Sequence, residues 1–451
     1  MSLKLRDYQE ELVDGIKQSM IAGNHSIIVQ SPPRSGKTVV MAHIAKSATD
    51  KNNRVLFFSH RKEINEQVYK TFENNEVNMD LVTIGGVQSL VRKIDKLDEP
   101  TIILIDEAHH SKASSYKKII DYFPNAYKLL FTGTPVRLDG SGFDDIADDL
   151  ILGKSVKWLQ EHGRIAPFKY YAPLMIDVAG LKKRAGEFTK QSVDETMKTV
   201  IYGDVIKHYE KLAKGKQAIV YTHSVEASEN VSKAFNEAGY NSAAVSGKTP
   251  KEERETAMRA FRNGDLKIMV NCELFTEGID LPNVDVCIML RPTQSLSLYL
   301  QFAMRALNPR EGKTAIIIDH VGNVERFGLP NQDREWSLQG IVKKKQTAKI
   351  GEPTVRVCEM CFATFWSKER ICPECGYENE PTKQEIELIR EAELKEIKEE
   401  QQRKLREKVQ TYVTPDMCQN MSELKEYQLQ HGYKNGWCWY QAKRLHLLRR
   451  K

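Results

Sequence analysis

The sequence predicts an α/β protein with two parallel sheets in tandem, followed by a small cysteine-bearing segment and a mainly helical tail. The first observation is that short apolar runs alternate with amphipathic stretches, which is typical of strands buried between two layers of helices. The second is a break in this alternation from about residue 140 to 200, after which it resumes. The third is a change of composition after residue 341, where the chain becomes basic and then almost wholly charged.

The strands are predicted from apolar runs of four to six residues. They lie at 26–29, 55–59, 101–106 and 128–133 in the first sheet, and at 217–222, 242–246, 267–272, 285–290 and 314–319 in the second. The irregular part between the sheets includes the glycine-rich and basic segment 179–188, which we expect to be a flexible connection. The predicted divisions are a first domain at 1–165, a linker at 166–200, a second domain at 201–345, a ribbon at 350–380 and a tail at 381–451.

The composition is that of a soluble globular protein and gives no sign of a membrane span. Of the 451 residues, 41% are hydrophobic and 28% are charged, and no apolar run approaches the roughly 20 residues of a membrane span. The N-terminus lacks the pattern of a signal peptide, so we expect a cytoplasmic protein. The net charge of +6 permits a polyanionic partner without requiring one.

The stretch SPPRSGKT at 31–38 has the features of a phosphate-binding loop. It follows a predicted strand and opens a predicted helix, so backbone N–H groups and the helix N-terminus would face an anion. Within Ser35-Gly36-Lys37-Thr38, the lysine would neutralise the β- and γ-phosphates and the threonine hydroxyl would coordinate Mg²⁺. Two prolines contribute no N–H, and Arg34 would face either the phosphate or the second domain. On this stretch alone, a chance Gly-Lys-Thr at a helix N-terminus remains an alternative.

Two adjacent acids end the strand at 101–106. Asp106 would hold Mg²⁺ through water, and Glu107 would orient or deprotonate the attacking water. A solvated strand end would explain the same residues. Because they follow a phosphate loop in a parallel sheet, we favour the catalytic interpretation.

At this point the chain resembles the superfamily II DEAD/DEAH-box helicases. The resemblance rests on DEAH at 106–109 together with SGKT at 35–38, and it continues in order through further motifs. These are LRDYQ (5–9), FSHRKEINEQ (58–67), VQSL (87–90), FTGTPVR (131–137), FTEGIDLPNVD (275–285) and YLQFAMRALNPR (299–310). The matched part covers about residues 3–323, and 314–340 resembles the members encoded by phages and prophages, which carry a C-terminal zinc ribbon.

The resemblance implies two RecA-like domains with ATP bound between them and a nucleic-acid strand running across both. The implied nucleotide contacts are Arg6, Gln9 (on adenine), Ser35, Gly36, Lys37, Thr38, Asp106 and Asp280. The implied catalytic residues are Lys37, Asp106, Glu107, His109, Gln301 and the arginine finger Arg305. The implied strand contacts are Arg61, Gln88, Ser89, Arg137, His223, Thr276 and Gly278.

The last motif departs from the family pattern at two positions. Met304 stands where the family has glycine, and Asn308 stands where it has a second arginine. Arg310 lies two positions late for that role.

Four cysteines form two C-x-x-C pairs separated by ten residues: Cys358, Cys361, Cys372 and Cys375. This spacing lets four thiolates converge on one Zn²⁺, and disulfides are the weaker explanation in a reducing cytosol. Such a ribbon could contact nucleic acid or serve as a scaffold, and the spacing favours neither.

The tail has two parts of different character. Residues 381–410 carry eight basic and eight acidic side chains, which suits a solvated helix. Residues 411–451 place aromatic side chains among basic ones, which suits either nucleic acid or a small helical module.

The sequence as a whole predicts an ATP-dependent helicase or translocase acting on nucleic acid, with DNA favoured over RNA, in phage replication or recombination. The expected cofactors are ATP, Mg²⁺ and Zn²⁺, the expected partners are nucleic acid and replication or recombination proteins, and the expected compartment is the host cytoplasm. The alternatives are the motor subunit of a restriction or defence complex, and an ATP-gated clamp with weak hydrolysis.

Overall fold

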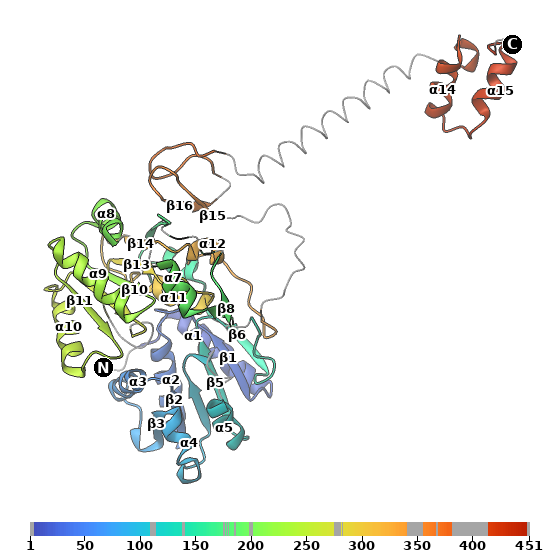
Figure 1. Cartoon of the computed structure of the whole chain (residues 1–451). Coiled ribbons are helices and arrows are strands. Elements are labelled where there is room, and N and C mark those ends of the chain that lie inside the picture. Colours follow the sequence, from blue (N-terminus) through green and yellow to red (C-terminus); the bar gives the residue numbers. More distant parts are fainter. Residues whose placement is uncertain are drawn as a thin grey trace. The chain divides into compact units, whose positions relative to one another are not determined.

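The computed structural model describes residues 4–108, 114–137, 140–174, 176, 178, 180–184, 186–197, 202–274, 281, 283–340, 355–366, 369–380 and 414–448. The chain forms two compact units, Met1–Tyr377 and Glu378–Lys451, which are described separately. Within the first unit, two sheets form two lobes, coloured blue to teal and green to yellow in Figure 1.

The first lobe is a six-stranded sheet in the order β3-β2-β4-β5-β1-β6, and every pairing is parallel. The strands are β1 (Ser26–Gln30), β2 (Val55–Ser59), β3 (Val82–Gly86), β4 (Ile102–Ile105), β5 (Tyr127–Thr132) and β6 (Asp149–Leu152). The helices are α1 (Asp7–Ile21), α2 (Lys37–Thr49), α3 (Lys62–Asn74), α4 (Val87–Val91) and α5 (Ser114–Tyr122). Ile27 and Val29 of β1 join a core with α1, α2 and α3, whereas Ile28 joins the core on the opposite face with α4 and α5.

The second lobe repeats this plan with the order β11-β12-β10-β13-β14-β7, again with parallel pairings. Its strands are β7 (Phe168–Tyr171), β10 (Ala218–Thr222), β11 (Ser242–Ser246), β12 (Ile268–Cys272), β13 (Val286–Leu290) and β14 (Ala315–Asp319). Its longer helices are α8 (Tyr202–Ala213), α9 (Val225–Glu237), α10 (Lys251–Asn263) and α11 (Leu296–Met304), and α12 (Asn323–Phe327) follows β14. Both sheets confirm the predicted α/β class.

The segment predicted as a linker is partly structured. It contains β7, the edge strand of the second sheet, and a hairpin of β8 (Lys183–Arg184) with β9 (Glu187–Phe188) inside the stretch expected to be flexible. It also contains α7 (Lys190–Met197), while α6 (Val156–Glu161) precedes it. The strand β7 escapes sequence analysis because only its pairing with β14 identifies it. The second lobe therefore begins before residue 201.

The cysteine-bearing segment packs on the edge of the second sheet. Its strands β15 (Val355–Val357) and β16 (Thr364–Trp366) pair antiparallel. The amide of Ala172, just after β7, donates to the carbonyl of Phe362 at 2.8 Å, and Tyr171 forms an antiparallel bridge with Ala363. The segment thus covers an edge strand that would otherwise offer unpaired backbone groups.

The second unit contains the helical module at 414–448, with α14 (Met421–Gln430) and α15 (Trp437–Arg444) around a small core. The charged helix predicted at 381–410 lies outside the described residues. None of the described helices has both the length and the apolar character that crossing a bilayer requires.

Candidate ATP site and nucleic-acid interface

The phosphate loop connects β1 to α2 and is closed by its own hydrogen bonds. The hydroxyl of Ser35 donates to the carbonyl of Pro32 at 2.6 Å and lies 2.6 Å from the hydroxyl of Ser31. Gly36 caps α2 with φ of 87°, and a Cβ there would lie 2.4 Å from Nε2 of Gln9. Only glycine fits this position without displacement. The loop therefore keeps a phosphate-loop shape despite its two prolines.

Residues at the start of α1 hold this loop by hydrogen bonds. The hydroxyl of Tyr8 and the amide Nε2 of Gln9 both donate to the carbonyl of Ser35, at 3.0 and 3.1 Å. The Oε1 of Gln9 accepts from the amide of Arg6 at 3.0 Å. Gln9 is thus buried, and both ends of its amide are used to hold the N-terminal segment and the loop together.

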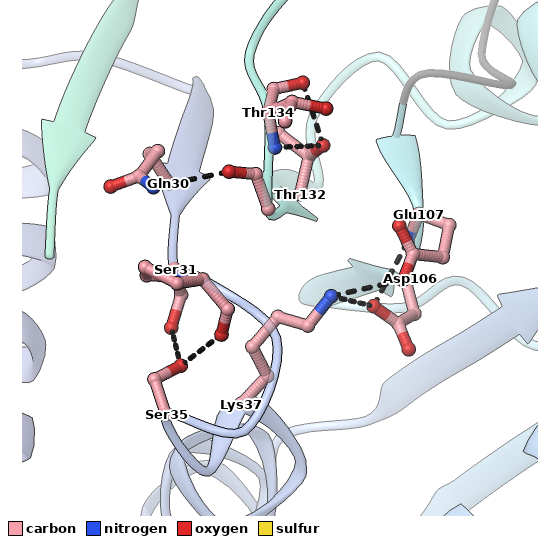
Figure 2. Close-up of polar contacts among 10 residues, drawn as sticks. Gln30, Ser31, Ser35, Lys37, Asp106, Glu107, Thr132 and Thr134 are labelled. Atoms are coloured by element: carbon pink, nitrogen blue, oxygen red, sulfur yellow. Dashed lines mark hydrogen bonds and ion pairs between the residues drawn. The ribbon is translucent and has the colours of Figure 1, made fainter. Parts of the chain in front are cut away.

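Lys37 reaches from the loop to the two acids that follow β4, as Figure 2 shows. Its Nζ lies 3.3 Å from an oxygen of Asp106 and 3.1 Å from an oxygen of Glu107. All three side chains are nearly buried, with exposed fractions of 11–12%. Glu107 has φ of 52°, a left-handed conformation uncommon for glutamate, and its amide donates to Asp106 at 2.9 Å.

The charges of this cluster depend on one another. Burial by itself would lower the pKa of the Lys37 ammonium, but the facing carboxylates reverse the effect and hold that pKa above its ordinary value. Burial raises the pKa of Asp106, and the charge of Lys37 opposes this rise. The cluster is therefore a buried ion pair that a bound polyphosphate could reorganise.

A second turn lies beside the loop, at the end of β5. The hydroxyl of Thr132 donates to the carbonyl of Thr134 at 2.9 Å and accepts from its amide at 3.2 Å. Gln30, at the end of β1, donates to the carbonyl of Gly133 at 3.1 Å (Figure 2). This turn belongs to the helicase-like segment FTGTPVR (131–137) and is thus tied to the strand that carries the phosphate loop.

Both lobes line a cleft of about 410 Å³ around this cluster, a volume within the range of small-molecule sites. Gly36, Lys37, Thr38, Asp106 and Glu107 line it from the first lobe, and Gln301, Met304, Arg305 and Pro309 line it from the second. Arg6, Arg34 and Arg164 add positive charge to the wall. Arg164 follows α6 outside any motif, so sequence analysis had no signal for it.

Arg34 joins the phosphate loop to the second lobe. Its Nε donates to the carbonyl of Met304 at 2.7 Å, and its Nη2 donates to the carbonyl of Arg305 at 3.2 Å. These carbonyls lie at the C-terminal end of α11, where the helix dipole favours a cation, and that of Met304 also accepts from the amide of Leu307 at 3.2 Å. Of the two directions open to Arg34, it takes the one toward the second lobe.

The residues that depart from the family pattern have structural partners. Met304 is buried, and Nδ2 of Asn308 donates to the carbonyl of Leu281 at 2.8 Å. Arg310 is paired with Asp285 on the surface. Of the residues of this motif that line the cleft, Arg305 is the one with a positive charge. Burial raises the pKa of Tyr221, and the nearby charge of Arg305 opposes this rise.

Comparison with known proteins agrees with this geometry. Residues 2–137 match the family described as type III restriction enzyme, res subunit, and residues 200–309 match the helicase conserved C-terminal domain. A 51.5 kDa protein of a Lactococcus phage is 41% identical over 375 residues, which cover 83% of this chain and 82% of that protein.

The chain belongs to the superfamily II helicases.

More distant members share the same two lobes. The DNA 3'-5' translocase XPB2 of Sulfurisphaera tokodaii is 26% identical over 373 residues, covering 71% of this helicase and 82% of that protein. The ATP-dependent type ISP restriction-modification enzyme LlaBIII, solved bound to DNA, has a similar fold with a TM-score of 0.52 and 17% identity. That match covers 71% of this chain and 28% of the LlaBIII chain. As a member of this family, the chain is an ATP-hydrolysing enzyme.

Some of the residues predicted to contact nucleic acid are exposed, and others contact groups within the protein. Gln88 and Ser89 are exposed on α4 and could face a ligand. Arg61 instead crosses to the second lobe, where its Nη1 donates to the carbonyl of Leu274 at 3.1 Å. His223 lies 3.2 Å from Asp194, and burial lowers its pKa.

Arg137 does not fit its predicted role. Its side chain is buried, with Nη1 donating to the carbonyl of Gly142 at 2.5 Å and Nη2 paired with Asp145 at 2.7 Å. The guanidinium also lies over the ring of Phe143. We therefore assign it to the core of the first lobe. The remaining predicted residues, His109, Thr276, Gly278 and Asp280, lie outside the described residues.

The four predicted zinc ligands do converge. The sulfurs of Cys358, Cys361, Cys372 and Cys375 all lie within 4.8 Å of one another. The pairs Cys358–Cys375 and Cys361–Cys372 are each 3.6 Å apart. Because Zn–S bonds are about 2.3 Å long, a tetrahedral site has S···S edges of about 3.8 Å. The cluster fits one zinc ion.

Replacement of Arg34 should impair turnover more than nucleotide binding. In Arg34→Ala the charge-assisted hydrogen bonds to the end of α11, each worth about 1.5–3 kcal/mol, are lost, and Arg305 is held less firmly in the cleft. We expect kcat for ATP to fall by roughly tenfold or more with little change in ATP affinity. Steady-state kinetics and equilibrium binding of a fluorescent ATP analogue separate the two quantities.

Arg34→Lys is the matched variant, because one ammonium reaches one carbonyl where the guanidinium reaches two. It should restore part of kcat. A large loss of ATP affinity with unchanged kcat would show that Arg34 binds phosphate instead.

Proposed function

We propose that this helicase is an ATP-driven translocase on DNA, with MgATP bound in the cleft between the two lobes. The observation that carries the proposal is the convergence of Lys37, Asp106 and Glu107 on a cleft whose opposite wall holds Gln301 and Arg305. Phosphoryl transfer requires this combination of a phosphate-binding cation, metal-binding and water-orienting carboxylates, and an arginine from a second element.

Each residue of the cleft would have a separate role in ATP hydrolysis. Lys37 would leave its carboxylate partners for the phosphate oxygens, and Glu107 would then be free to orient the attacking water and accept its proton. Thr38 and Asp106 would hold Mg²⁺, which supplies charge neutralisation at the phosphates. Arg305 would stabilise the charge that develops on the γ-phosphate, and Gln301 would line the same wall.

The contacts between the lobes supply a route from hydrolysis to movement. Arg34 binds the end of α11. Arg61 binds the carbonyl of Leu274, directly before the helicase-like segment FTEGIDLPNVD (275–285). A change in conformation of the phosphate loop or of the start of α3 would therefore alter these hydrogen bonds and displace the second lobe. Gln88 and Ser89 remain our candidates for strand contacts in the first lobe.

DNA is the favoured track because the relative XPB2 is named a DNA translocase. The Lactococcus phage relative favours a role in phage replication or recombination in the host cytoplasm, together with other proteins of those processes. A motor subunit of a restriction complex is the second candidate, since residues 2–137 match a family described by a restriction enzyme subunit.

ATP hydrolysis by the purified chain tests this proposal. With Mg²⁺ present, turnover should rise when single-stranded DNA is added, and it should rise less with RNA of the same sequence. Lys37→Ala should lose both ATP binding and turnover. Glu107→Gln should still bind ATP but lose about 100-fold or more in kcat, because a positioned base contributes at least that factor.

Full DNA-stimulated activity in both variants would refute the site. Equal stimulation by RNA would refute the choice of track. Strong nucleotide-dependent DNA binding without repeated turnover would instead favour an ATP-gated clamp.

We also propose that the four cysteines bind one Zn²⁺ and that this zinc has a structural role. The ribbon attaches to the second lobe through Phe362 and Ala363 and through an ion pair between Lys169 and Glu374 at 2.5 Å. The ring of Phe362 packs edge-on against His208. Loss of the metal would therefore uncover the edge strand β7.

Removal of the zinc site should release one metal ion and destabilise the second lobe. Cys358→Ser combined with Cys375→Ser should reduce bound zinc from one ion per chain to none, lower Tm and promote aggregation. Cys418→Ser is the matched control, because this buried thiol belongs to the separate tail module and should leave the zinc content at one. Retention of one zinc ion by the double variant would contradict the assignment, and metal analysis measures it.

A further inference from the structure

The helical module at 414–448 has a small core and a large exposed aromatic surface. Its buried apolar side chains are Cys418, Leu424, Tyr427, Cys438 and Ala442. On α15, Trp439 is 59% exposed and its neighbour Tyr440 is 67% exposed. Tyr433, in the turn before that helix, is 44% exposed. These three large rings are therefore not used in the core of the module.

One of the exposed rings, that of Tyr433, is held in a stack of aromatic side chains. Trp437 lies nearly parallel to Tyr433, with centroids 4.5 Å apart and planes at 11°, and nearly parallel to Tyr427 at 5.5 Å and 12°. Tyr427 belongs to the buried core, so this stack ties the turn to the two helices. The ring of Tyr433 is therefore presented outward in a fixed orientation, which lowers the entropic cost of stacking a ligand on it.

Charge is distributed unevenly along the module. Its three acids, Asp416, Glu423 and Glu426, all precede residue 427. Asp416 is paired with Arg444, and Glu423 accepts from the amide of Gln419 at the start of α14. From 427 to 448 the chain contains Lys434, Lys443 and Arg444 and no acid.

Basic and aromatic groups also coincide in space. The ammonium of Lys443 lies 5.9 Å from the ring centroid of Trp439, one helical turn away on α15. Lys434 is exposed next to Tyr433. The first pair places a cation beside an exposed ring in space, and the second places the two side by side in the sequence.

We propose that Tyr433, Lys434, Trp439, Tyr440 and Lys443, hereafter the aromatic-basic surface, bind single-stranded nucleic acid. The rings would stack on unpaired bases, and the two lysines would contact the phosphates. A duplex fits less well because its bases are already stacked on one another. The absence of acidic residues from 427–448 favours an anionic ligand over an apolar protein partner. This surface goes beyond the proposed ATP-driven track, because it needs neither ATP nor the cleft, and it would keep the motor on a strand between cycles.

Binding of a fluorescent oligothymidylate to the full-length chain without nucleotide tests the proposal. Trp439→Ala with Tyr440→Ala should weaken binding by roughly tenfold or more, since each base–aromatic stack contributes at least several-fold. Lys434→Glu with Lys443→Glu should weaken binding and reduce the slope of log Kd against log salt, by roughly 0.7 for each lost phosphate contact. Duplex of the same length should bind more weakly than the single strand. The ATPase rate at saturating strand should stay unchanged in both double variants, so failure here is distinguishable from failure of the ATP site.

Leu429→Ala is the matched control, because Leu429 is 77% exposed on α14 but carries no ring. It should bind the oligonucleotide like the parent chain. Parental affinity in the aromatic double variant, or an equal loss in Leu429→Ala, would overturn base stacking. An unchanged salt slope in the lysine variant, which keeps every ring of the module, would overturn the phosphate contacts. Binding that prefers duplex would overturn the choice of ligand.

Discussion

The buried ion pair of Lys37 with Asp106 and Glu107 is the constraint on which the rest of this structure depends. An ammonium group this deeply buried must have anionic partners, because leaving it without them would cost several kcal/mol. The parallel sheet provides them by bringing the loop after β1 and the acids after β4 to the same edge. In the function proposed above, the phosphates of a nucleotide would replace the carboxylates as partners of Lys37 and release Glu107 for catalysis.

The two lobes are joined by Arg34, for which the sequence left this direction open, and by Arg61, which the family resemblance places on the nucleic acid. Arg34 belongs to the phosphate loop, and Arg61 belongs to a motif associated with the strand, yet both donate to backbone carbonyls of the second lobe. Backbone acceptors are insensitive to side-chain substitution, so such contacts tolerate departures like Met304. Asn308, which replaces an arginine of the family pattern, stabilises the carbonyl of Leu281 within its own lobe. In the proposed mechanism, Arg305 would therefore act without the second arginine of the family pattern.

Elements and residues that belong to a local sequence pattern could be predicted, whereas those whose position depends on contacts distant in the sequence could not. The nine apolar runs became strands, and Lys37, Asp106, Glu107 and the four cysteines could be placed because each lies in a motif of fixed spacing. Strand β7 could not be predicted, since four residues with two tyrosines become a strand only by pairing with β14. Arg164 and the placements of Arg34 and Arg137 depend on tertiary contacts that no local pattern encodes. Arg137, predicted to contact nucleic acid, is held inside by Gly142 and Asp145.

The central claim is that hydrolysis is completed by an arginine of the second lobe acting in the cleft of the first. Turnover and ATP binding of Arg305→Ala, measured side by side with saturating single-stranded DNA, test it most directly, with Arg310→Ala as the control outside the cleft. We predict that kcat falls by about 1000-fold or more in Arg305→Ala, as for other arginine fingers, while ATP affinity changes only a few-fold and Arg310→Ala stays active. Parental turnover in Arg305→Ala would contradict the claim.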